Sequence, residues 1–360
     1  MKKSLFALAV LGAFAGAASA QTSVTIYGVV DVGVSRTDTN VTEPIWGLTS
    51  GQQNGSRIGF RGTEDLGGGL SAIFTLENGF NVDTGALGQG GRLFGRQAFV
   101  GLSSKGFGTV KLGRQYTLNH DALNVFDPFA TNLAGNTENA IPGSAGLGLP
   151  GLPYFFAGNV LPLAAAPTGA ALPIGATPAD IRVDNSVVYQ TNNIAGFTGA
   201  LQYGFGEQST AFPNGRQISA SATYANGPIA AVATYNTGRA VAGGVDQKSY
   251  LLGGTYNFNV AKLHAGFQDN EIDAGATTFE SRTFLLGTTV PVGPGNILAS
   301  WIRADVQNID AKSDQIALGY THPLSKRTNL YTSAAWQKTE RAGAADVKAN
   351  IFNAGVRHLF

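Results

Sequence analysis

The C-terminal stretch 350–360 alternates between two kinds of side chain up to the final residue of the chain. Reading back from the terminus, one face carries Phe360, His358, Val356, Ala354 and Phe352. A period of two residues with one mostly apolar face is the pattern of a β-strand. A strand that ends on an aromatic ring suits a membrane barrel, because such rings gather at the boundary between lipid and water. The rest of the chain should then supply the remaining strands.

The composition favours one large β domain. The chain has 49 Gly in 360 residues, no Cys and only 13% charged residues, whereas soluble domains average about 25% charged residues and about 7% Gly. Mean hydropathy is +0.03, and after residue 20 no apolar run approaches the ~18 residues of a spanning helix. A barrel hides its lipid-facing residues in alternation, so a neutral average is compatible with it. The lack of Cys excludes disulfide and thiol chemistry.

The N-terminus predicts export. Two lysines precede a short apolar segment, and an Ala-Ser-Ala pattern ending at Ala20 completes the arrangement of a secretory signal peptide. We expect 1–20 to be cleaved and 21–360 to form the barrel. Loss of the two lysines from 24 basic residues leaves 22, against 23 acidic residues, so charge does not point to nucleic acid as a partner.

Alternation along the rest of the chain indicates sixteen strands in all, an even number as antiparallel closure requires when both termini lie on one side. The expected strands lie at about 22–34, 56–62, 69–81, 92–103, 107–116, 182–193, 196–206, 214–225, 228–240, 244–258, 261–273, 277–290, 296–308, 312–322, 328–340 and 347–360. A compact turn is expected at 63–69. Tight joints alternate with more polar, often longer ones, as in barrels that cross an outer membrane.

The rhythm breaks at about 117–181, where about two helical turns at 120–126 precede a long run rich in Gly, Ala, Pro and Leu. A stretch this long without regular structure is usually functional or disordered. Lipid offers no hydrogen-bond partner, so the last strand must pair with the first. Sixteen strands leave a water-filled lumen, and we expect the long segment to fold into it and narrow the pore.

Six segments spread over the mature chain resemble the Gram-negative general diffusion porins, especially the betaproteobacterial type of Neisseria and Burkholderia. They are VTIYG at 24–28, GSRIGFRGTEDLGGGL at 55–70, GRLFGRQAFVGL at 91–102, FGTVKLGRQ at 107–115, RVDNS at 182–186 and GVRHLF at 355–360. The resemblance implies an outer-membrane, sixteen-stranded, homotrimeric barrel with its third external loop folded into the pore. It also implies that Phe360 is the residue read by the barrel assembly machinery, and that ions and small hydrophilic solutes pass without any cofactor.

Three arginines are expected to line the constriction. Alternation places Arg57, Arg96 and Arg182 on lumen faces, and by motif they match the family's constriction arginines. We expect Asp121 and Asp127 of the inserted loop to face them. Guanidinium groups opposite carboxylates produce a transverse field that orients water and dipolar solutes, and the excess of arginine predicts a mild anion preference. The alternatives are that loop acids such as Glu138 reverse this preference, or that the arginines are solvated rim charges.

Arg114 shares a face with apolar neighbours that point outward. A charge at the bilayer midplane costs about 2–4 kcal/mol, so a neighbouring subunit would have to cover it, and the resemblance implies that this face is the trimer contact. The alternative is a rim position from which the long side chain reaches the interface.

Enzyme motifs are poorly represented. The four His have no metal-type spacing, no G-x-S-x-G elbow occurs, and the literal G-x-G-x-x-G at 146–151 follows no strand. A substrate-specific channel with an aromatic slide or basic ladder remains the second hypothesis. A barrel enzyme or adhesin is the third, and a secreted soluble β protein is the fourth.

Overall fold

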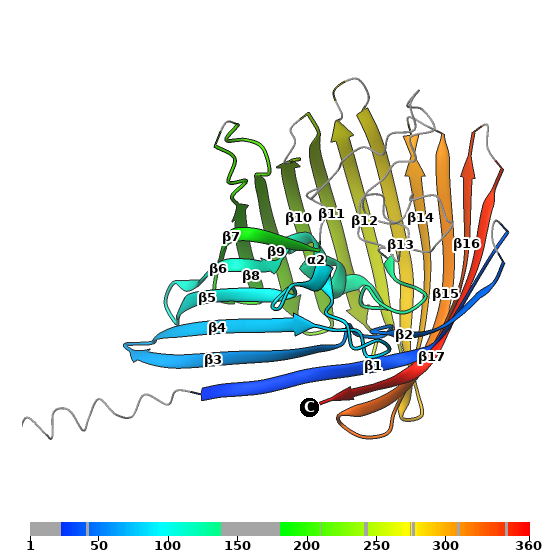
Figure 1. Ribbon diagram of the computed structural model, residues 1–360, viewed down its shortest axis with the longest axis horizontal. Helices are drawn as coiled ribbons and strands as arrows, with labels where there is room; N and C mark the ends of the chain where they lie inside the picture. The colour runs from blue at the N-terminus through cyan, green and yellow to red at the C-terminus, as the bar shows by residue number, and fades with distance from the viewer. Residues whose placement is uncertain are drawn as a thin grey trace, which may run out of the picture.

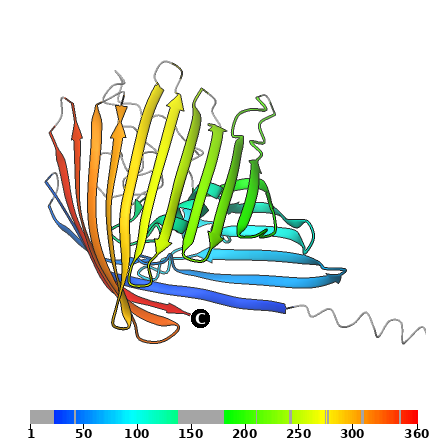
Figure 2. The ribbon, with the colours of Figure 1, turned by 180° about the vertical axis from the view of Figure 1, so that it is seen from behind.

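The computed structural model describes residues 23–40, 43–137, 181–209, 211–240, 244–273, 275, 278–307, 310–342 and 345–360. Their strands form one antiparallel sheet that closes on itself (Figure 1). The strands of the two facing walls cross steeply in this view, as tilted barrel strands do. Figure 2 shows the wall of long strands from behind. The expected signal peptide at 1–20 and Glu138 lie outside the described residues.

The described residues form seventeen strands and one α-helix. The strands are β1 (Ser23–Thr39), β2 (Ile45–Ser50), β3 (Arg57–Gly67), β4 (Leu70–Gly79), β5 (Gln97–Ser104), β6 (Gly108–Tyr116), β7 (Arg182–Gln190), β8 (Phe197–Gly204), β9 (Gln217–Asn226), β10 (Ile229–Arg239), β11 (Asp246–Asn257), β12 (Lys262–Asp273), β13 (Thr278–Val292), β14 (Gly295–Val306), β15 (Ala311–Pro323), β16 (Thr328–Arg341) and β17 (Val347–Leu359). The helix is α2 (Leu118–Phe126), and a 3₁₀ turn, η1 (Gln89–Gly91), lies between β4 and β5.

The seventeen strands make sixteen crossings of the wall, which confirms the expected number. The strands β2 and β3 are two parts of one crossing, because β1 pairs with β2 through Val32 to Thr37 and with β3 through Ser23 to Val29. The sequence did not predict β2: residues 51–55 were identified as turn-forming, but not as an interruption within one crossing. It was also wrong to place a turn at 63–69, because β3 continues in register with β4 to Asp65 and reverses only at Gly67.

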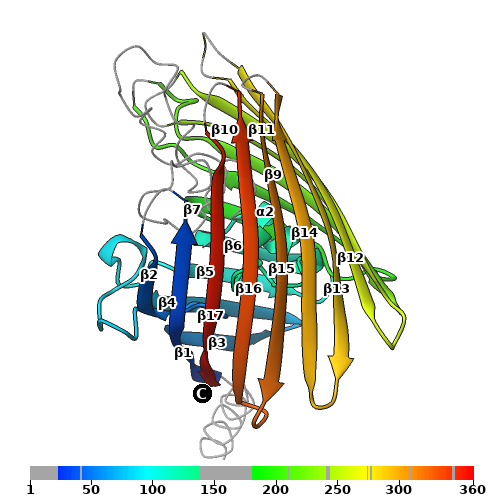
Figure 3. The same cartoon turned by 90° about the vertical axis from the view of Figure 1, so that its right-hand side faces the viewer.

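The first and last strands close the barrel, as the terminal alternation predicted. β1 pairs with β17 from Val29 opposite Leu359 to Thr39 opposite Ala349 (Figure 3). At the end of this seam the backbones of Gly28 and Phe360 exchange two hydrogen bonds of 3.0 and 3.1 Å. A Cβ on residue 28 would lie 2.2 Å from the Phe360 ring, so the ring rests where only glycine leaves room.

The long strands alternate between a lipid face and a lumen face. On β11 the exposed side chains of Tyr250 and Leu252 alternate with the buried side chains of Ser249 and Leu251. Period-two burial of this kind puts successive residues on opposite sides of the sheet. The outward faces are therefore apolar, and this excludes the soluble β protein considered from the sequence.

The third external loop begins inside the barrel, as predicted. Thr117 caps α2 by accepting a hydrogen bond of 3.1 Å from His120 N. The buried face of α2, Ala122, Leu123 and Phe126, packs against inward residues of β10, β11, β13 and β14. This helix therefore lies against the long wall, opposite the short strands β5 to β8 (Figure 1). Within the described residues, no helix has the length and apolar character to span a bilayer.

Glycines in the long wall make room for the loop. A Cβ on Gly253 of β11 or on Gly266 of β12 would lie 2.0 or 2.1 Å from the ring of Phe126. Farther along, Phe129 and Leu133 pack against inward residues of β14 to β17. The loop is thus fitted into recesses of the wall, and the remaining lumen lies between it and the opposite side.

Replacing Phe126 with Ala should loosen the loop. Truncation of a buried Phe costs about 3–5 kcal/mol, and here it would also leave the two glycine recesses empty. We expect larger fluctuations of the open-channel current and a higher mean conductance in planar bilayers. The matched control is Phe258→Ala at the exposed turn between β11 and β12. Equal current noise in the two variants would contradict the packing described above.

Candidate functional site

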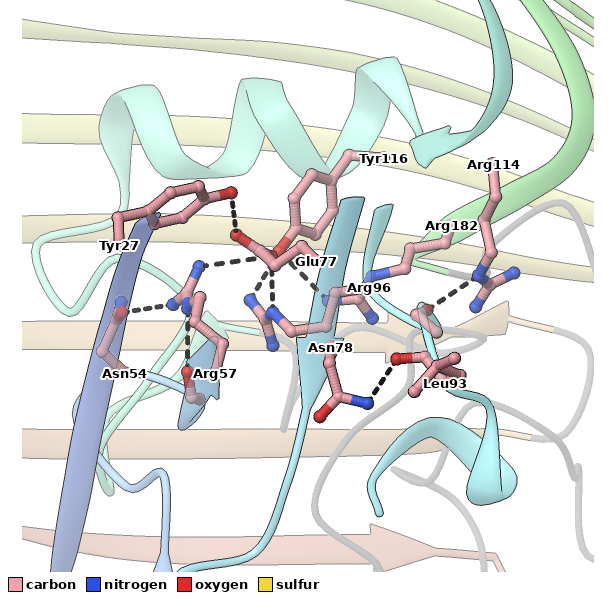
Figure 4. Close-up of polar contacts among 12 residues, drawn as sticks. Tyr27, Asn54, Arg57, Glu77, Asn78, Leu93, Arg96, Arg114, Tyr116 and Arg182 are labelled. Carbon is pink, nitrogen blue, oxygen red and sulfur yellow. Dashed lines mark hydrogen bonds and ion pairs between the residues drawn. The ribbon is translucent and has the colours of Figure 1, made fainter. Parts of the chain in front are cut away.

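The three predicted arginines come together on the side of the barrel that contains β3 to β7. Arg57 begins β3, Arg182 begins β7, and Arg96 immediately precedes β5. Alternate strands of an antiparallel sheet run in the same direction, so the first residues of β3, β5 and β7 lie at corresponding ends of these strands. Residues far apart in sequence therefore meet in the cluster shown in Figure 4.

Glu77 of β4 is the counter-ion within this cluster. Its Oε1 lies 2.7 Å from Arg96 Nε and 3.7 Å from Arg57 Nη1, and its Oε2 accepts a hydrogen bond of 2.9 Å from Tyr27 Oη. Glu77 is 2% exposed, and a buried carboxylate is stable only when it is paired and hydrogen-bonded in this way. The same contacts hold the two guanidinium groups in fixed positions.

Tyr116, the last residue of β6, connects Arg96 and Arg182 with the inserted loop. Its hydroxyl accepts hydrogen bonds from Arg96 Nη2 at 2.6 Å and from Arg182 Nη2 at 3.1 Å. The Arg182 guanidinium also lies 4.6 Å from the centre of the Tyr116 ring, an attractive cation–π arrangement. The ring stacks on His120 of α2, with 4.8 Å between centroids. The wall cluster and the loop are therefore in direct contact.

The cluster carries a net positive charge. Three guanidinium groups are accompanied by one carboxylate, and both remaining neighbours are neutral tyrosines. Arginine stays ionised in proteins, so this excess of two positive charges is permanent. Water and salt screen it only partly over the ~8 Å Debye length of physiological solution. A solute passing between this cluster and α2 would cross a field directed from the wall toward the loop.

The two predicted aspartates have different positions. Asp121 lies on the exposed face of α2, turned away from the packed face, and interacts electrostatically with His120 and with Lys111 of β6. Asp127, in contrast, is 4% exposed and accepts hydrogen bonds from the backbone N–H groups of Phe129, Thr131 and Thr137 at 2.8 to 3.1 Å. Its carboxylate organises the loop and does not line the pore, contrary to expectation.

Arg114 lies outside the cluster. It donates to the backbone carbonyl of Gly95 at 2.7 Å and forms an ion pair with Asp184, which also pairs with Arg92 at 2.9 Å. Asp184 and Arg92 are about half exposed. Arg114 therefore has a counter-ion of its own chain, which reduces its need for cover by a second subunit.

Glu77, Tyr27 and Tyr116 were not predicted from the sequence. An acid at an inward position of the predicted strand 69–81 was a usable signal for Glu77, because charges within a membrane strand require partners. Nothing local distinguishes the two tyrosines from others on barrel strands. Among the described residues, no three His, Asp or Glu side chains are grouped to hold a metal ion.

Comparisons with known proteins agree with this architecture. The family model for the Gram-negative porins matches residues 7–342. Outer membrane porin protein 32 of Delftia acidovorans is 36% identical over 365 residues, which cover 99% of this chain and 95% of that protein. An outer membrane porin protein of Bordetella pertussis is 32% identical over the full length of both chains.

Among solved structures, the anion-selective porin from Comamonas acidovorans superposes with a TM-score of 0.79 at 31% identity. The match covers 94% of this chain and 100% of that one. The comparisons thus extend over nearly the whole barrel, including the strands that carry the arginine cluster.

Docking of the loop should depend on pH through Asp127. Burial raises the pKa of this carboxyl from its ordinary 3.8 to about 6, although its hydrogen bonds act in the opposite direction. The docked loop therefore takes up a proton more readily than the undocked loop between about pH 4 and pH 6. Docking should be most stable below pH 4 and lose up to ~3 kcal/mol as pH rises through 6.

Hydrogen exchange of the segment 118–137, compared at each pH between the native chain and Asp127→Asn, would measure this effect. The difference between the two should grow from pH 4 to pH 7, because the variant has no carboxyl to titrate. A pH-independent difference would contradict the assignment of Asp127.

Proposed function

The chain belongs to the family of Gram-negative porins, passive channels of the outer membrane, and from this premise we propose that its arginine cluster makes it a mildly anion-preferring channel. The observation that carries the proposal is the excess of guanidinium over carboxylate among Arg57, Arg96, Arg182 and Glu77. The anion selectivity stated for the Comamonas acidovorans porin supports it.

The geometry provides selectivity without tight binding. Glu77 and Tyr116 hold the guanidinium groups before any ion arrives, so little reorganisation accompanies passage. Arg57 keeps 16% of its side chain exposed, enough to meet hydrated ions. A channel must attract an ion strongly enough for entry and weakly enough for exit. Preformed charges that are partly neutralised and partly exposed meet both conditions.

The loop side completes the constriction. Asp121 is the described loop carboxylate on the exposed face of α2, and Lys111 offsets part of its charge. The field across the opening is therefore set mainly by the arginines. Small polar solutes would be oriented by this field. Apolar solutes would displace the water that the field orders and make no electrostatic interaction to compensate for that loss.

Replacing Arg57 and Arg182 together with Ser should shift ion preference toward cations. At ~8 Å through water each charge contributes about 0.5 kcal/mol, and salt screening over one Debye length reduces this to ~0.2 kcal/mol. The contribution favours anions and disfavours cations, so the anion-to-cation permeability ratio should fall roughly fourfold. The reversal potential of a planar bilayer in a salt gradient measures this ratio. The control is Lys326→Ser with Arg327→Ser, an equal loss of charge at an exposed turn between β15 and β16. An unchanged reversal potential in the first variant would refute the proposal.

We further propose that the channel is a homotrimer that uses the side of the short strands. β5 and β8 have eight residues each and β6 and β7 have nine, whereas a spanning strand needs about 9–11. β13 has 15 residues. The strands β5 to β8 are too short to span the full hydrocarbon thickness of a bilayer. A neighbouring barrel would cover this side, including the ion pairs of Arg114.

Recognition of Phe360 by the assembly machinery stays a prediction.

Arg114→Ala should weaken the trimer. Without this cation, Asp184 keeps only Arg92 as a partner, so the ion-paired group that the neighbouring barrel would cover is weakened. We expect the trimer to dissociate at a lower temperature in mild detergent, followed by semi-native electrophoresis. Arg303→Ala removes a comparable outward Arg–Asp pair from the long wall and should leave dissociation unchanged. Equal effects of the two variants, or a monomeric native chain, would contradict this placement.

A further inference from the structure

The interruption of the second crossing is a structured element, which we call the inward turn and define as residues 51–56, between β2 and β3. Its first residue, Gly51, has a φ of +72°, and a Cβ there would lie 2.9 Å from Gly55 Cα. The turn is therefore tightly folded. It contacts three parts of the lumen: the seam near Asp31, the arginine cluster and the inserted loop.

Asp31 of β1 holds one side of the turn. Its Oδ2 accepts hydrogen bonds from the backbone N–H groups of Gln53 at 2.9 Å and of Asn54 at 2.5 Å. Its Oδ1 accepts a hydrogen bond of 2.6 Å from the Tyr331 hydroxyl on β16. The backbone of Asp31 also binds both ends of the turn, through Gly51 N and the Ser56 hydroxyl. A single carboxylate thus fixes the turn to β1 and β16, the strands on either side of β17.

The other side of the turn holds two of the arginines. The carbonyl of Gly55 accepts a hydrogen bond of 2.9 Å from Arg57 Nε, and the side-chain oxygen of Asn54 accepts one from Arg57 Nη2 (Figure 4). Arg96 lies directly on Gly55, since a Cβ there would be 2.7 Å from Arg96 Nη1. Any movement of the turn would therefore displace both guanidinium groups.

The turn also contacts the inserted loop and β16. The carbonyl of Gln52 accepts a hydrogen bond of 2.7 Å from Leu133 N. The side-chain oxygen of Gln53 accepts one of 2.7 Å from Asn329 on β16, which in turn binds Arg357. The turn is therefore the element that sets the distance between the arginines and the loop.

We propose that Asp31 is a positioning residue for ion selectivity, which acts through the inward turn on Arg57 and Arg96. The inference rests on the anion preference proposed above. Asp31 does not act as a pore-lining charge, because it is 0% exposed and its carboxylate is occupied by three donors. Its neighbour across the seam is Arg357, the register partner on β17. Asp31 affects ions indirectly, because it fixes the positions of the Arg57 and Arg96 guanidinium groups.

The sign of the change in Asp31→Asn separates the two roles. If Asp31 acted as a fixed charge, its removal would make the pore more anion-selective. If it positions the turn, the Asn side chain, with one acceptor oxygen in place of two, releases the arginines. The anion-to-cation permeability ratio should then fall roughly twofold. We expect this fall, measured as the reversal potential in a salt gradient.

Two further variants keep the test independent of the Asp31 charge and of folding. Gly55→Ala leaves every charge in place but forces Arg96 away, and it should lower the permeability ratio in the same direction. Tyr331→Phe removes one of three donors and should have a smaller effect. The matched control is Ser35→Ala, which deletes an inward hydrogen bond to Thr49 that involves no residue of the turn. Heat stability of the folded barrel is followed in all variants.

A raised or unchanged permeability ratio in Asp31→Asn, with the barrel folded, would overturn the inference. If Asp31→Asn does not fold, Gly55→Ala decides, and an unchanged ratio there overturns it equally. If Arg57→Ser with Arg182→Ser shifts the permeability ratio but Asp31→Asn and Gly55→Ala do not, only the positioning role of Asp31 is wrong. When none of them shifts it, the proposed anion preference itself is wrong.

Discussion

The structure depends on one constraint: a backbone amide in hydrocarbon has no hydrogen-bond partner except another backbone. An open sheet would leave two unpaired edges, so β1 must pair with β17 and the sheet must close. Closure then fixes the alternation of faces, because each strand has lipid on one side and lumen on the other. The apolar outward face and the polar or small inward residues of the long strands follow from it.

Inside the barrel, the two sides of the lumen have different functions. The long wall accepts the loop through glycine recesses at Gly253 and Gly266, where Phe126 rests. The short wall carries the arginines, whose positions depend on Glu77, Tyr116 and the inward turn. The opening is thus defined by side chains whose places are set by packing on one side and by ion pairs on the other. Rigid placement of this kind is what allows a weak field to discriminate between ions.

Local periodicity was sufficient to predict the number of crossings, the closing seam and the loop in the lumen. It failed where long-range contacts decide. The inward turn has no period of its own and is held by Asp31, a residue some twenty positions earlier. Asp127 was expected at the pore because an acidic loop residue usually meets water, but its position after α2 directs it to the loop backbone. Glu77 was overlooked because pairing with Arg96 is visible only once β4 and β5 lie side by side.

The seam between β1 and β17 also constrains the order of events in biogenesis. It joins β1, the first strand, to β17, the last, and at one end its outermost hydrogen bonds are those between Gly28 and Phe360. Contacts between residues this far apart form late and slowly. The polypeptide therefore travels to its destination with both edges of its sheet unsatisfied, and such edges are the surfaces through which chains aggregate. The topology therefore requires that these unpaired edges be protected from aggregation until the barrel closes.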